Sequence, residues 1–170
     1  MPPGKPLSLD TYTRWQHAIR CWAAVDDVYS IYDDFSHPDT PLVVRGLCLQ
    51  TLRQWLAWGR DQDHKLFEDL RSFHKTSVMK GKIIGLLHGI SREDERKPAT
   101  YQLLIDGLNN DVLPIRTLSH WHLLNLAPQG DKIAYDPAWP RDRRDQAIRQ
   151  WQKLIPPGQL PSTGAPPPKK

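Results

Sequence analysis

The stretch PDTPLVVRGLCLQTLRQWLA, residues 38–57, has the apolar spacing of an amphipathic α-helix. Its apolar stripe consists of Val44, Leu47 or Cys48, Leu52, and Trp55 or Leu56. Gaps of three or four residues place these side chains on one face of a helix. Pro41 suits the first turn, because its missing N–H would have no partner there. The pattern therefore predicts a helix over residues 41–58 with one buried face.

A second stretch, NNDVLPIRTLSHWHLLNLAP at residues 109–128, has the same arrangement. Each stretch contains an aspartate, a nearby proline and a β-branched residue directly before an arginine. Aligning Arg45 with Arg116 pairs Val44 with Ile115, and the separation of 116 − 45 = 71 residues leaves room for one intervening helix pair. An arginine at this place can pack its stem along the core and donate to nearby carbonyls, so we expect both arginines to serve structure.

Helical spacing continues through most of the chain. Further helices are expected over residues 10–35, 61–75, 77–91, 98–108, 111–127 and 141–155. No segment has the alternation of a strand or the turn of a tight hairpin, so the predicted fold class is all-α. Three helix pairs of roughly 35–40 residues, each burying its apolar face on its neighbours, describe an α-solenoid.

The two arginine-containing stretches resemble HEAT-type repeats of the armadillo-like class. The resemblance covers about residues 15–128, although the middle pair, 62–90, lacks the arginine step. It implies a right-handed superhelix of about three antiparallel helix pairs that acts as a curved scaffold for protein partners and rarely as a catalyst. The segment 130–161 also resembles the C-terminal region of bacterial HEAT-like proteins, and its helix is expected to cap the stack.

Composition sets the expected boundaries. We expect a proline-rich arm at residues 1–9, one HEAT-like helical domain at 10–156 and a disordered proline-rich tail at 157–170. No apolar run reaches the length of a membrane helix and no signal peptide stands at the start, so the default expectation is a cytoplasmic protein with no membrane partner.

The sequence contains none of the motifs that indicate catalysis or cofactor binding. Nucleophile turns of the Gly-x-Ser-x-Gly type and glycine-rich phosphate loops are absent. His120 and His122 are two residues apart, and on a helix such side chains diverge, so they cannot share one metal ion. Cys21 and Cys48 belong to no zinc or disulfide spacing and are expected in the core. We therefore expect a non-enzyme with no catalytic residue, cofactor, metal or small-molecule substrate.

The partner-binding candidates come from exposed aromatic rings and from charge. Tryptophan often anchors protein contacts, and Trp58 and Trp139 lie near the ends of helices, although packing of a loop onto the body is the preferred role for both. The segment from Asp26 to Asp39 holds five aspartates and no basic residue, and could receive a basic peptide. The tentative partner-binding residues are therefore Trp58, Trp139, Asp26, Asp33, Asp34, Arg141 and Arg144.

Nucleic-acid binding is the alternative function. Some HEAT-like proteins hold duplex DNA in a basic concave face, and one such enzyme group excises alkylated bases. Here the candidates would be Arg141, Arg143, Arg144 and Arg149 on the basic C-terminal helix, with Trp139 nearby. The net charge of +4 includes Lys169 and Lys170 at the tail, so the body carries only 4 − 2 = +2. Because so small a charge attracts phosphate weakly, a protein partner of unknown identity is the preferred hypothesis.

Overall fold

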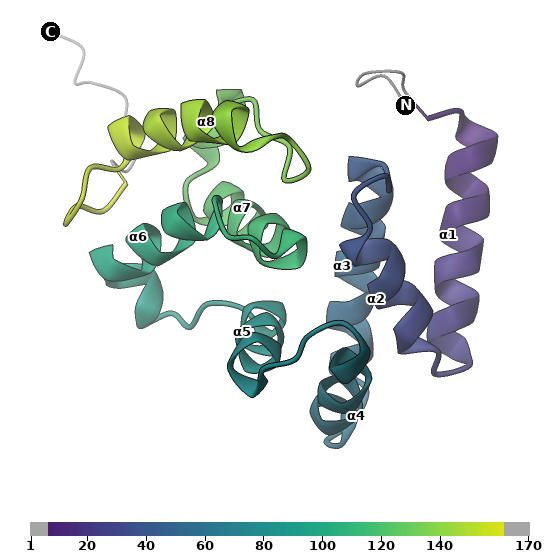
Figure 1. The fold of residues 1–170 in the computed structure, drawn as a ribbon. Helices are drawn as coiled ribbons and strands as arrows, with labels where there is room; N and C mark the ends of the chain where they lie inside the picture. The colour runs from purple at the N-terminus through teal and green to yellow at the C-terminus, as the bar shows by residue number, and fades with distance from the viewer. Residues whose placement is uncertain (1–6, 162–170) are drawn as a thin grey trace, which may run out of the picture. The chain divides into compact units, whose positions relative to one another are not determined.

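The computed structural model describes residues 7–161, and these residues are almost entirely helical. Within that range the chain forms eight α-helices and three short 3-10 helices, and no strand (Figure 1). The predicted all-α class is confirmed. Most of the expected arm and tail, at residues 1–6 and 162–170, lies outside the described residues.

The chain divides into two compact units between Gly89 and Ile90. The helical domain expected over residues 10–156 spans both units. Unit 1 is Met1–Gly89 and unit 2 is Ile90–Lys170, and each is described by itself below.

Unit 1 is built around α3. Its elements are α1 (Leu9–Ala24), α2 (Val28–Ser36), α3 (Leu42–Leu56), α4 (Gln62–Asp69), a 3-10 turn (Leu70–Ser72) and α5 (Ser77–His88). Helix α3 contacts each of the other four α-helices. Of its predicted stripe, Val44, Cys48, Leu52, Trp55 and Leu56 are buried, whereas Leu47 is half-buried and lines a groove. Cys21, expected in the core, is instead exposed, because it lies on the solvent side of α1.

The helix expected over 10–35 is two helices, α1 and α2, with a sharp turn between them. Asp26 adopts a left-handed backbone with φ of 63°, which ends helical propagation. Its carboxylate accepts hydrogen bonds from Trp55 Nε1 at 2.7 Å and from Lys65 Nζ at 2.8 Å. Asp27 then caps α2 by accepting from the Ser30 backbone N–H. The hydrogen bonds of Asp26 and Asp27 therefore divide the segment into two helices, although its apolar spacing is continuous.

Unit 2 contains a 3-10 turn (Asp94–Arg96), α6 (Pro98–Gly107), α7 (Leu113–Leu126), a second 3-10 turn (Pro128–Lys132) and α8 (Arg141–Leu154). Helix α6 contacts both α7 and α8. Trp151 of α8 is fully buried, and its ring lies so close to Gly130 that a Cβ there would come within 2.0 Å of it. Only glycine therefore fits at this position.

Arg45 and Arg116 hold the turns that precede their helices. Arg45 is buried, and its guanidinium donates to the carbonyls of Thr40 at 2.8 Å and His37 at 3.1 Å. Arg116 donates to the carbonyls of Asn110 at 2.6 Å, Asp111 at 2.9 Å and Pro137 at 2.7 Å. The expectation that both arginines are structural, drawn from the repeat, is confirmed by these bonds.

Replacing Arg116 by methionine, which keeps the apolar stem, should lower the free energy of unfolding by about 3 kcal/mol, because buried carbonyls lose a charged donor. Urea denaturation followed by circular dichroism measures this loss. Arg92→Met is the matched control, since Arg92 is an exposed arginine of the same unit, and its effect should be small. Equal effects of the two substitutions would contradict a structural role for Arg116.

Candidate functional site

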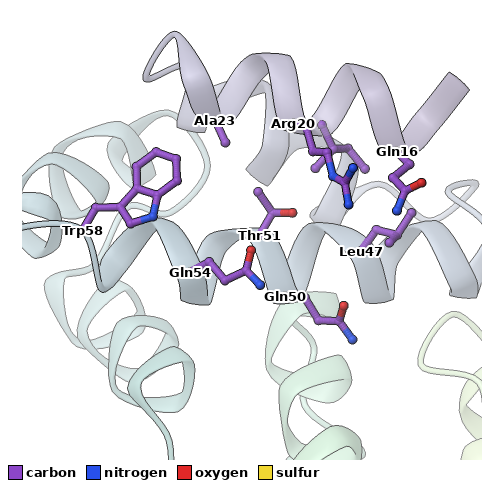
Figure 2. Close-up of a pocket in the computed structure, with 9 residues that line it drawn as sticks. Gln16, Arg20, Ala23, Leu47, Gln50, Thr51, Gln54 and Trp58 are labelled. Carbon is purple, nitrogen blue, oxygen red and sulfur yellow. The ribbon is translucent and has the colours of Figure 1, made fainter. Parts of the chain in front are cut away.

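The best-defined hollow in unit 1 is a groove between α1 and α3. It has a volume of about 180 Å³ (Figure 2). The lining residues are Gln16, Ile19, Arg20, Ala23, Leu47, Gln50, Thr51, Gln54 and Trp58. Gln16 and Leu47 line one end and Ala23 and Trp58 the other, so the two helices run in the same direction.

Helical periodicity places these side chains on facing stripes. On α1, Gln16 and Arg20 are one turn apart, and on α3 and the turn after it Gln50, Gln54 and Trp58 follow at intervals of four residues. Ile19 and Ala23 are buried beneath them. The groove therefore combines an apolar floor with polar side chains along both rims.

The polar side chains along the rims of the groove make no hydrogen bond or ion pair within the described part of the chain. Gln16, Arg20, Gln50, Thr51 and Gln54 line the groove, and none of their side chains has a hydrogen-bond or ion-pair partner among residues 7–161. Each glutamine amide carries both donors and an acceptor, and the guanidinium carries five donors. Three amides, one hydroxyl and one guanidinium thus line a common, solvent-accessible space.

Trp58 closes one end of the groove. It follows the last turn of α3, and 63% of its surface is exposed. The other exposed apolar aromatic residue of the described chain, Tyr29, is 46% exposed. Packing of the surrounding loop onto the body, the role preferred for this tryptophan from sequence, does not bury the ring, and the alternative of a surface anchor stays a prediction. Trp139 is half-buried instead, with the Arg143 guanidinium 3.7 Å above its ring.

The acidic candidates are not assembled into one surface. Asp26 is bound to Trp55 and Lys65, and these hydrogen bonds hold the pKa of its carboxyl below the usual value. Asp34 is half-buried, and burial followed by the charge of Asp33 raises the pKa of its carboxyl. Asp33 is exposed beside it on α2. Asp26 is exposed as well, but its carboxylate is already bonded to Trp55 and Lys65, so of the three aspartates only Asp33 is exposed without a side-chain partner in residues 7–161.

The basic candidates on α8 also have different environments. Arg144 is buried, and donates to the Trp139 carbonyl at 2.9 Å and to Asn109 Oδ1 at 3.1 Å. Arg141 is exposed in the first turn of the same helix. Arg144 therefore fixes the loop before α8 rather than facing a partner.

His120 and His122 lie on α7 among different aromatic neighbours. The His120 ring packs 4.7 Å from the Tyr135 ring centre and 6.4 Å from that of Trp151, whereas His122 packs 4.8 Å from Trp121. Across residues 7–161, no group of three or more histidine, cysteine, aspartate or glutamate side chains could hold a metal ion. The same residues contain no helix long and apolar enough to cross a membrane.

Comparison of the chain with models of known protein families, with curated proteins and with solved structures gives no match.

Sequence reasoning identified Trp58 but missed the rest of the groove. The missed polar residues are Gln16, Arg20, Gln50, Thr51 and Gln54. The available signal was the interval of four residues that joins Gln50 and Gln54 to Trp58. Glutamine on a helix usually faces solvent without function, so the spacing gains meaning only when α1 is seen beside α3.

Burial lowers the pKa of the His120 imidazole to about 4. Because the folded value lies below the unfolded value of about 6.5, the unfolded state takes up the proton first. The preference of the folded state for neutral His120 therefore costs nothing above pH 6.5, where the imidazole is neutral in both states. As the pH falls from 6.5 toward 4, the free energy of unfolding decreases. Between pH 7 and 4.5 the wild-type chain should lose roughly 2 kcal/mol more stability than His120→Gln.

Urea denaturation at several pH values measures this difference. His17→Gln is the control, since His17 is exposed on α1, and it should keep the wild-type pH dependence. A His120→Gln profile parallel to that of the wild type would contradict the expected effect of burial.

Proposed function

We propose that this chain is a non-catalytic scaffold of HEAT-like helix pairs, stacked as an α-solenoid, that binds protein partners through the α1–α3 groove. The observation that supports this function most is the set of polar side chains that line the groove beside the exposed Trp58 and make no side-chain hydrogen bond within residues 7–161. The structural use of Arg45 and Arg116 in corresponding turns supports the repeat character.

The chemistry of the groove favours a peptide backbone as its ligand. An extended peptide presents alternating N–H donors and carbonyl acceptors, and a glutamine amide can pair with either group. Gln50 and Gln54 on one rim and Gln16 on the other offer this pairing from two sides. Trp58 adds a large rigid surface of the kind that dominates contact energies.

Size and composition argue against an enclosed small-molecule site or a catalytic one. The volume of about 180 Å³ is below the roughly 300–1,000 Å³ typical of small-molecule pockets. The described lining residues include no histidine, cysteine, aspartate or glutamate that could serve as nucleophile, acid or base. An open groove of this kind suits one side of an extended chain.

Nucleic-acid binding through α8 remains the second hypothesis and has weaker support. Arg144 is committed to Asn109 and the Trp139 carbonyl, and Arg143 lies over the Trp139 ring. Asp142 and Asp145 alternate with the basic residues and reduce the positive potential of the helix. The polar side chains of the groove, in contrast, make no hydrogen bond or ion pair within residues 7–161 that a ligand would have to replace.

Selection from a displayed library of random peptides on the full chain tests the proposed function. We expect peptides that bind the wild type and lose at least about tenfold in affinity for Trp58→Ala, because removing an anchor tryptophan from a contact costs more than 1 kcal/mol. Gln50→Ala combined with Gln54→Ala should also weaken them.

Leu103→Ala is the matched control, since Leu103 is a large apolar residue of α6 that is 68% exposed and does not line the groove. Circular dichroism establishes that each variant remains folded. The proposed function is wrong if no selected peptide distinguishes the wild type from both groove variants.

A further inference from the structure

The α1–α3 groove continues into an apolar hollow at the start of the same two helices. That hollow is lined by Leu7, Leu9, Tyr12 and Val43. Tyr12 precedes Gln16 by one helical turn and Val43 precedes Leu47 by one turn, so the hollow and the groove follow each other along the same faces of α1 and α3. The groove and the hollow together are called the seam below. Leu9 is 81% exposed and Val43 is 48% exposed, which makes this end of the seam an accessible apolar patch.

The seam therefore has three chemically distinct sections. The apolar hollow lies at one end, the side-chain amides and Arg20 lie in the middle, and Trp58 lies at the other end. Val43 and Trp58 are 58 − 43 = 15 residues apart, and a helical rise of 1.5 Å per residue gives a length of roughly 22 Å. An extended chain at about 3.3 Å per residue covers that length with about seven residues.

Charge determines what the middle of such a segment should be. Arg20 is the one formally charged residue among the described residues that line the groove or the hollow. Its guanidinium has no ion-pair partner within residues 7–161, although Arg14 one and a half turns earlier on α1 is paired with Asp10 at 2.9 Å. An acidic side chain facing Arg20 would gain a charge-assisted hydrogen bond that no residue of the described chain provides.

We infer that the seam binds an extended peptide segment of about seven residues that has apolar side chains at both ends and a carboxylate near its centre. This inference rests on the proposed function and specifies its ligand. The apolar ends occupy the Leu9–Tyr12–Val43 hollow and the face of Trp58, and the carboxylate pairs with Arg20. The proline-rich segment 156–170 of this chain fits poorly, since it contains two lysines and no aspartate or glutamate.

Fluorescence anisotropy with three labelled peptides on the full chain tests the inference. The probes are acetyl-LSSESSL-amide and its versions with glutamine or lysine in place of the glutamate, and their near-symmetry makes binding direction irrelevant. The wild type should bind the glutamate probe about fivefold more tightly than the glutamine probe, as expected for an exposed ion pair, and the lysine probe least.

Arg20→Glu should reverse this order and favour the lysine probe. Arg14→Glu is the matched control, because Arg14 is an exposed arginine of the same helix that does not line the seam, and it should keep the wild-type order. Raising the salt concentration should reduce the preference for glutamate in the wild type.

The outcomes separate the two proposals. Peptides that require Trp58 but show no charge preference, or the same preference in Arg20→Glu, overturn the acidic ligand and leave peptide binding intact. Displacement of the glutamate probe by the peptide PSTGAPPPKK assigns the seam to this chain's own tail and also overturns the acidic ligand. Self-association that Trp58→Ala abolishes assigns the seam to a second copy of the chain and has the same consequence. Absence of any Trp58-dependent peptide, in the probes and in the library alike, overturns both.

Discussion

Two buried arginines set the geometry on which both units depend. A helix that is entered through a turn leaves the carbonyls of that turn without regular partners, and buried carbonyls need hydrogen bonds. Arg45 and Arg116 each lie in the first turns of a central helix and reach back to these carbonyls. The guanidinium is suited to this task because it has several donors in one plane and remains charged at every relevant pH. The entry angle of α3 and of α7 is thereby fixed, and the positions of the helices that pack on them follow.

The groove is a consequence of how α3 is placed. Helix α3 contacts α1 and α2, and because α1 and α3 run in the same direction, equivalent turns of the two helices lie beside each other. Ile19 and Ala23 seal the seam at its base, while the long polar side chains at Gln16 and Arg20 remain at its rim. Small and medium-sized residues in the floor keep the helices close, and the longer rim residues leave a hollow above them. The groove proposed as a ligand site thus arises from ordinary helix packing.

Much of the fold could be predicted from the sequence because helical periodicity is a local signal. The stripe of α3, the start of α8 and the structural role of Arg45 and Arg116 all follow from spacing and from the internal repeat. The break between α1 and α2 could not be predicted, since it depends on Trp55 and Lys65, which are distant in sequence and bind Asp26. The groove escaped prediction for the same reason: Arg20 and Gln50 lie on helices whose pairing no short-range pattern specifies. The arrangement of helix pairs as a solenoid stays a prediction.

The fate of the aspartates shows why charge along a sequence differs from charge on a surface. The segment from Asp26 to Asp39 is the most acidic part of the chain and by composition suggests a receptor for a basic peptide. In the folded unit Asp26 neutralises Lys65 and ties down the α1–α2 turn, Asp27 caps α2, and Asp34 turns toward the interior. Three of the five aspartates are therefore bonded or half-buried within the fold, while the groove on α1 and α3 is lined by no described carboxylate and contains Arg20. The acidic ligand proposed for the groove therefore has the opposite charge to the basic peptide that the composition of the segment suggests.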